Sequence, residues 1–169
     1  MKGMFYFMCF LFLFSCKNKK TEKLIYPRQI GDISYDVKLD SPSFIPCNGN
    51  DKIFQYFNNG KGLEYKGSKR EIENLFKKKY THIKVDESGL IRIRFIVNCK
   101  GETGRFRVIQ MNNNYEQFTF DNRITNQLLM LTQSLNGWKT KQYGRDREID
   151  YYQYLIFKIE KGNLIEILP

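Results

Sequence analysis

The chain has 169 residues, with 28 lysines and arginines against 18 aspartates and glutamates, and therefore a formal net charge of +10. This length accommodates one domain, or one domain and a tether, and the content of 41% hydrophobic and 15% aromatic residues argues against a wholly disordered chain. The single histidine, His82, excludes histidine-rich metal sites and most histidine-based catalytic dyads. The positive charge favours an anionic partner, whose identity depends on where the protein is located.

The N-terminus has the features of an export signal. Lys2 is followed by an apolar run over residues 4–14, which corresponds to about 16 Å of helix and roughly half of a bilayer core. The run ends in Leu13-Phe14-Ser15-Cys16, which resembles a bacterial lipobox. This resemblance implies that the chain is cut after Ser15 and that Cys16 carries more than one acyl group, as stable anchoring requires. A buried core helix is the alternative, and the basic stretch that follows at once disfavours it.

Residues 1–15 are therefore predicted to be a signal peptide, and residues 16–32 a lipid-anchored basic tether whose lysines favour anionic head groups. We expect the membrane to be a partner through this lipid anchor. Lys17 directly after the lipidated cysteine fits sorting to the outer membrane, on its periplasmic side.

Two cysteines remain in the mature protein once Cys9 leaves with the signal and Cys16 takes lipid. In an exported protein, Cys47 and Cys99 are candidates for a disulfide, which would stabilise the fold by about 4 kcal/mol through loop closure. Two free buried thiols are the alternative. A zinc site at these cysteines is not supported, because only His82 could join them.

The region over residues 33–67 is predicted to be an N-terminal extension. Residues 33–38 have the pattern of a short strand, and turn-forming residues follow them. Residues 53–57 and 63–66, separated by a stretch rich in Asn and Gly, predict a β-hairpin.

Two helices are predicted by periodicity and capping signals. The first begins at Ser68, whose spacing to Glu71 is that of a capping box, and continues to about residue 80. The second is capped by Asp121 and continues to about Leu135, with Gly137 as its stop. The apolar stripe of the first helix is Ile72, Leu75, Phe76 and Tyr80, and that of the second is Ile124, Leu128, Leu131 and Leu135.

Four strands are predicted over residues 90–99, 105–111, 147–160 and 164–168. The first three alternate apolar residues with charged or polar ones, which is typical of strands with one buried face. The residues expected to face inward are Ile91, Ile93, Phe95, Val97, Cys99, Phe106, Val108, Ile149, Tyr151, Leu155, Phe157 and Ile159. The predicted fold class is α+β: an antiparallel sheet of three to four strands with two helices packed on one face, preceded by a small β-hairpin region.

The order of elements from about residue 89 to 159 resembles the C-terminal domain of the TonB energy-transducer family, and residues 68–169 are predicted to form a domain that is similar to it. The resemblance rests on Gly89 before an alternating strand, the hairpin Lys100-Gly101-Glu102, a helix followed by Trp138-Lys139, a turn at Gly144, and a closing strand with Phe157. It implies binding of an extended receptor peptide, added as a strand to the sheet edge. The sequence departs from the family by having four prolines in total, a short apolar run, and Thr140 where the family usually has proline.

A further departure lies at the C-terminus. The turn at residues 161–163 reverses the direction of the backbone, so that residues 164–168 are expected to pair with the edge that the family offers to its peptide. This self-capped arrangement makes the family's usual mode of peptide binding less favourable.

Catalysis is not predicted. Glu148 and Asp150 share a strand face and are explained more simply by cross-strand pairing with arginines. The leading hypothesis is a non-enzymatic envelope lipoprotein that binds a protein or peptide by strand addition or sheet-face contact, with no cofactor, no metal and no nucleic acid. The alternative is a structural lipoprotein that homodimerises through its sheet. The predicted partner-binding residues are Arg92, Arg94, Arg105, Arg107, Tyr152 and Tyr154.

Overall fold

A computed structural model describes residues 31–56 and 62–169. The expected signal peptide, the lipidation site Cys16 and the tether up to residue 30 lie outside the described residues. Residues 33–169 form one compact unit, so the predicted extension and the predicted domain pack together. Within the described part of the protein, no helix combines the length and the apolar character needed to cross a membrane.

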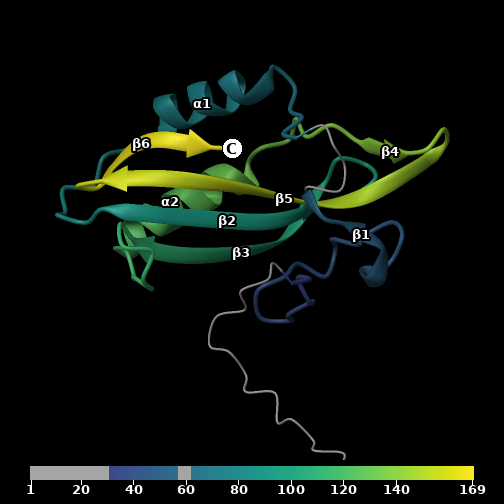
Figure 1. Ribbon diagram of the computed structural model, residues 1–169, viewed down its shortest axis with the longest axis horizontal. Helices are drawn as coiled ribbons and strands as arrows, with labels where there is room; N and C mark the ends of the chain where they lie inside the picture. The colour runs from purple at the N-terminus through teal and green to yellow at the C-terminus, as the bar shows by residue number, and fades with distance from the viewer. Residues whose placement is uncertain (1–30, 57–61) are drawn as a thin grey trace, which may run out of the picture. The chain divides into compact units, whose positions relative to one another are not determined.

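The fold is α+β, as predicted, but the sheet is larger than expected and mixed (Figure 1). Its strands are ordered β1-β5-β2-β3, and β4 and β6 also pair with the long strand β5. Strand β1 runs parallel to β5, and the other pairs are antiparallel. The elements are the 3₁₀ helix η1 (Asn50–Lys52), β1 (Ile53–Phe54), α1 (Ser68–Lys79), β2 (Gly89–Val97), β3 (Thr103–Asn112), α2 (Asn122–Gln133), β4 (Lys141–Tyr143), β5 (Arg147–Glu160) and β6 (Asn163–Leu168). A sheet of six strands therefore replaces the expected antiparallel three or four.

Both helices pack on one face of the sheet, as predicted. Helix α1 buries Ile72 and Phe76, and the Phe76 ring lies 4.9 Å from that of Phe157 on β5. Helix α2 buries Ile124 and Leu128 in the same core. The inward-facing residues expected on β2, together with Tyr151, Leu155, Phe157 and Ile159 on β5, are almost fully buried in this core. Alternation along β2 and β5 therefore identified correctly the face that packs on the helices.

The helix ends agree with the sequence in one case and differ in the other. Asp121 caps α2 as predicted, because its carboxylate accepts the Arg123 N–H at 2.8 Å, although the helix ends at Gln133, before Leu135. At α1, the Ser68 hydroxyl accepts from the Arg70 N–H at 3.4 Å, and not from the Glu71 N–H that a capping box requires. Gly67 precedes this helix with a φ of 79°, in the left-handed region, and a Cβ atom there would overlap the Glu71 side chain, so both the backbone conformation and the local packing favour glycine.

The predicted β-hairpin in the extension is wrong. Strand β1 pairs in parallel with β5, at Asp150 and Tyr151, and Tyr65 forms a single bridge with Trp138. The expected strand at residues 33–38 is also wrong, because this segment has no regular structure. Both segments pair with, or lie over, distant parts of the sheet, and a local pattern cannot indicate such partners.

Strand β6 forms as expected and pairs with β5 from Ile156 to Glu160. The tight turn before it has Lys161 and Gly162 at φ angles of 46° and 75°. The prediction that the last strand covers the edge of β5 is therefore confirmed over that stretch, and β6 becomes an outer strand of the sheet (Figure 1).

Candidate functional site

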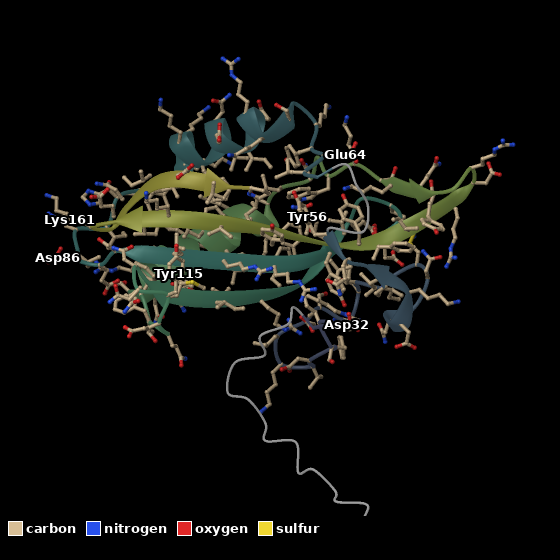
Figure 2. The ribbon with its side chains drawn as sticks, in the orientation of Figure 1. Asp32, Tyr56, Glu64, Asp86, Tyr115 and Lys161 are labelled. Atoms are coloured by element: carbon tan, nitrogen blue, oxygen red, sulfur yellow. A yellow bond between two sulfur atoms is a disulfide. The ribbon has the colours of Figure 1, made fainter. Side chains whose placement is uncertain are left out.

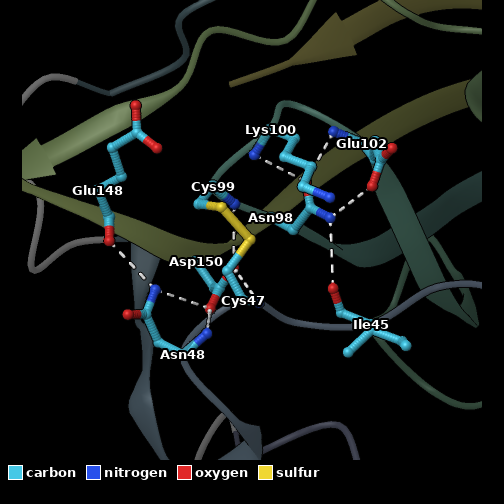
Figure 3. The surroundings of a disulfide bond; sticks show 9 residues. All are labelled: Ile45, Cys47, Asn48, Asn98, Cys99, Lys100, Glu102, Glu148 and Asp150. Carbon is cyan, nitrogen blue, oxygen red and sulfur yellow. Dashed lines mark hydrogen bonds between the residues drawn. A yellow bond between two sulfur atoms is a disulfide. The ribbon is translucent and has the colours of Figure 1, made fainter.

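The predicted disulfide between Cys47 and Cys99 is present, with the Cα atoms 5.9 Å apart (Figure 3). The buried carboxylate of Asp150 lies beside it and accepts hydrogen bonds from the backbone N–H groups of Cys47 and Cys99, both at 3.0 Å. Its second oxygen accepts the backbone N–H and the side-chain amide of Asn48, at 2.7 and 3.1 Å. This arrangement joins the extension to β2 and β5.

The same three side chains, of Cys47, Cys99 and Asp150, form the one cluster of potential metal ligands in the part of the protein that the structure describes. Both sulfur atoms are bonded to each other, and four N–H groups already donate to the carboxylate. These atoms therefore already take part in bonds that stabilise the fold. We call the disulfide and the carboxylate beside it the latch.

The extension covers much of the predicted partner-binding face. Arg94, Arg105 and Tyr152 are at most 8% exposed, and the Ile33 N–H donates to the Tyr152 hydroxyl at 3.1 Å. The Arg94 guanidinium stacks on Tyr152, 4.1 Å from the ring centroid, and donates to Gln55 at 2.9 Å. These side chains hold the extension on the sheet, a role that the sequence pattern did not indicate.

Arg107 also contacts the extension. Its guanidinium donates two hydrogen bonds of 2.7 Å to the carboxylate of Asp40, and a third, of 2.8 Å, to the Ser34 carbonyl. Donation from Arg107 is the main reason why the pKa of Asp40 lies below its ordinary value. The residue that neutralises this arginine thus lies 67 positions away in the sequence.

Arg92 and Tyr154 are half-buried on the same face, beyond the extension. The Arg92 guanidinium lies 4.7 Å from the centroid of the Tyr154 ring, and the ring of Tyr56, labelled in Figure 2, lies 4.8 Å from Tyr154. Burial lowers the pKa of Arg92. The residues of the predicted set are therefore divided between a covered group and this pair.

Next to Arg92, the outer face carries an apolar row, which we call the open face. Its residues are Leu90, Ile109, Met111, Ile156 and Leu168. The pairing register places them side by side: Ile109 opposite Arg92, Arg92 opposite Ile156, and Ile156 opposite Leu168. Ile109 is 45% exposed, and the others are half-buried.

Helix α1 lies next to β6 (Figure 1). Side chains of the two elements line a groove, which we call the β6 groove. It encloses about 500 Å³. One side of the groove is lined by α1 and the segment that directly follows it, and the other side by β6. The lining residues are Glu73, Phe76, Lys77, Tyr80 and His82 on the first side and residues 163–167 on the second. Ile165, which is 53% exposed, is the most accessible large apolar residue in this lining.

Hydrogen bonds to the β5–β6 turn support the end of the β6 groove. The Tyr80 hydroxyl donates to the Gly162 carbonyl at 2.9 Å, and burial raises its pKa to about 12, so it remains a neutral donor. The His82 Nε2 lies 3.0 Å from the carbonyl oxygen of Lys161, which Figure 2 labels at the turn. Glu73 and Glu166 balance Lys77, so the walls of the groove carry mixed charge.

The two outer strands of the sheet differ in how far they are covered. The segment after β3 folds back on that strand: Met111 bridges Gln117, and the Phe118 N–H donates to the Gln110 carbonyl at 3.2 Å. Among residues 31–56 and 62–169, the strand pairing of β6 is with β5 alone. The edge of β6 is consequently the more accessible of the two.

The sequence did not predict the β6 groove. The apolar stripe of α1 indicates that this helix packs on the sheet, but it does not indicate which strand lies next to it. The chain matches no family model, no curated protein and no solved structure. The resemblance to the TonB C-terminal domain stays a prediction from sequence.

Proposed function

We propose that this protein is a non-enzymatic, lipid-anchored envelope protein that binds an extended polypeptide by strand addition to the outer edge of β6. The observation that carries this proposal is the position of β6, whose outer edge borders a groove of about 500 Å³ against α1. The resemblance to TonB C-terminal domains suggests the same mode of binding. In that family the peptide would pair with the strand that corresponds to β5, whereas here β6 pairs with β5, so an added peptide would pair with β6 instead.

Strand addition requires backbone groups that are free to pair. The outer edge of a sheet presents a row of N–H and C=O groups, and proteins usually protect such edges with charges, bulges or proline. Strand β6 has three such features: the charge of Glu166, a register shift in its pairing with β5 near Ile159, and Pro169 directly after its end. Its edge is therefore only partly protected against pairing with another strand. Six residues of strand offer about 20 Å of edge, which matches a short linear motif.

The β6 groove supplies the selectivity that an edge alone lacks. Alternate side chains of an added strand point to opposite faces, so every second residue would enter the space between β6 and α1. Leu164 and Ile165 provide apolar contact there, whereas Lys77 and Glu73 provide charged groups of both signs. A peptide that alternates apolar and polar residues fits this environment.

A second candidate function is homodimerisation through the open face. The favouring observation is the open face, an apolar row in which Ile109 is 45% exposed and the other residues are half-buried in the described part of the protein. Arg92 lies within this row, and its Nε is buried without a hydrogen-bond partner among the described residues. A second copy would cover the row and exclude water from it.

A pair of matched variants separates the two functions. Ile165→Glu places a charge in the β6 groove, and Ile109→Glu places one on the open face; both residues are about half exposed, at 53% and 45%. Peptides are selected on the purified full-length protein from a random display library and then titrated by fluorescence anisotropy. We expect Ile165→Glu to weaken their binding by at least about tenfold, or 1.4 kcal/mol, and Ile109→Glu to leave it unchanged.

Equal losses in both variants, or a selection that yields no binding peptide, would contradict strand addition at β6. Sedimentation velocity over a range of protein concentrations tests the second candidate. A dimer that Ile109→Glu dissociates and Ile165→Glu does not would favour homodimerisation. A monomer at every concentration would rule it out.

A further inference from the structure

We propose that a cavity between the extension and β3 binds a small carboxylate that has an apolar body, with Arg105 as the partner of its charge. The cavity is open to solvent, has a volume of about 340 Å³, and shares no lining residue with the β6 groove or the open face. Arg105 is the one charged residue in its lining, and Asn50 lies beside it. The apolar walls are Tyr35, Pro42, Phe44, Ile45 and Pro46.

The guanidinium of Arg105 is buried and incompletely bonded. The residue is 6% exposed, and its guanidinium donates to the Ile33 carbonyl at 3.3 Å and to the Asn50 side-chain oxygen at 2.7 Å. Its Nε is buried and has no hydrogen-bond partner among the described residues. Arginine carries five N–H donors, so this group retains donors for a further acceptor.

The charge of Arg105 also lacks a full counterion in the part of the protein that the structure describes. Asp40 is near enough to interact electrostatically with Arg105, but both oxygens of its carboxylate accept from Arg107, at 2.7 Å each. One carboxylate therefore serves two guanidinium groups. Because burying a charge without an ionic partner is costly, a ligand carboxylate would offset that cost, and a planar carboxylate matches the arginine fork.

The remaining walls indicate that the ligand has an apolar part. Tyr35 and Ile45 are 45% and 69% exposed at the rim, and the Tyr35 ring centroid lies 5.7 Å from the guanidinium carbon. The Phe44 ring is held against Gly104, where a Cβ atom would overlap it, so this wall has a defined position. The volume suits a group about as large as one aromatic amino acid and is too small for a long peptide.

The proposal is tested by calorimetric titration of the full-length protein with N-acetylphenylalanine and with its amide. The two probes share an apolar body and differ in the carboxylate, so we expect the acid to bind at least about tenfold more tightly. A longer peptide that ends in phenylalanine with a free carboxylate distinguishes the sources. If it binds as tightly as the small acid, the natural ligand is the C-terminus of a polypeptide; if the small acid alone binds, the ligand is a free molecule.

Two variants on the extension test the location without changing the buried arginine, and a third replaces the arginine itself. Ile45→Asp places a negative charge beside the cavity and should weaken binding of the acid by about tenfold or more. Val37→Asp is the matched control, because Val37 is 79% exposed on the same extension and does not line the cavity. Arg105→Lys keeps the positive charge but removes the forked guanidinium, so it should also weaken binding of the acid. Ile165→Glu should leave binding of the acid unchanged.

Equal affinity for the acid and the amide, or no binding of the acid at millimolar concentration, would overturn the proposal. So would equal effects of Ile45→Asp and Val37→Asp. Because Ile165→Glu serves in both sets of experiments, failure at the β6 groove and failure at this cavity are distinguishable.

Discussion

Asp40 and Asp150 are the buried carboxylates that attach the extension to the sheet. Asp150 accepts four N–H groups around the disulfide, and Asp40 holds Arg107 through two hydrogen bonds. A buried carboxylate is tolerated when its lone pairs are occupied, and both residues meet that condition. Their role is therefore to fix the extension over the outer face.

We expect Asp40→Asn to destabilise the protein by about 1–3 kcal/mol near neutral pH, because one of the charge-assisted hydrogen bonds to Arg107 is lost. The pKa of Asp40 lies below its ordinary value of 3.8 in the folded state, chiefly because Arg107 donates to it. A lowered pKa adds stability above 3.8, and this stability is lost as the pH falls through the folded-state pKa.

Urea unfolding of the two proteins at neutral and acidic pH measures this difference in the free energy of unfolding. The difference should shrink as the carboxyl group becomes protonated. Asp51→Asn is the control, because Asp51 is an exposed carboxylate on the same extension and should change little. A penalty for Asp40→Asn that stays constant down to the most acidic pH would contradict the ion-pair explanation.

At the scale of elements, the β5–β6 turn reverses the backbone so that β6 can pair with β5. Gly162 has a φ of 75°, and a Cβ atom on it would overlap the backbone oxygen of Ile83. Gly144, at the turn between β4 and β5, has a similar φ of 74° with open space around it. The two glycines thus share a positive φ, which would strain any other residue, and they differ in steric surroundings.

We expect Gly162→Ala to lower the free energy of unfolding by about 3 kcal/mol or more, and Gly144→Ala by about 1 kcal/mol. Strain in the left-handed region accounts for the smaller loss, and displacement of the segment at Ile83 adds the rest. Thermal unfolding followed by circular dichroism compares them directly. Equal losses would show that the close approach at Gly162 is relieved at little cost.

The disulfide is the second device at this scale, because it joins residues separated by 52 positions and closes the extension onto β2. Replacing Cys47 and Cys99 together with serine should cost about 4 kcal/mol, from the larger conformational entropy of the unfolded state. The free energy of unfolding in denaturant, for the oxidised wild type and the double variant, gives the value. Reduced wild type should resemble the double variant, and if it unfolds like the oxidised protein the latch contributes little.

At the scale of the whole molecule, the sequence predicts a lipid anchor at Cys16, which the described residues do not include. We expect the intact mass of the native protein to correspond to a polypeptide that starts at Cys16 and carries acyl groups, recovered in the membrane fraction. Cys47 and Cys99 should react with an alkylating reagent only after reduction. Cys16→Ala is the control and should leave an unprocessed or soluble protein. A native mass that begins at Met1 would refute the anchor.

Much of the central sheet was predictable, for a physical reason that is local. Alternation with period two identifies the buried face of β2 and β5, and the periodicity of α1 and α2 does the same for the helices. The turn before β6 is an equally local signal, whereas the disulfide was expected from the count of cysteines in a chain predicted to be exported. The α+β class, the strand bounds of β5 and the disulfide follow from such patterns.

The sites depended on contacts that no local pattern records. In the sequence, Arg94 and Arg105 have the pattern of exposed outer-face residues, yet the extension buries them. The extension supplies the oxygen atoms that accept their hydrogen bonds, on Gln55 for Arg94 and on Ile33 and Asn50 for Arg105. The β6 groove exists because α1 packs beside the last strand, almost a hundred residues later in the sequence. Sequence alone determined which face of each strand and helix is apolar. The tertiary structure decided which polar residues became buried and where the cavities formed, because both depend on packing between segments that are distant in sequence.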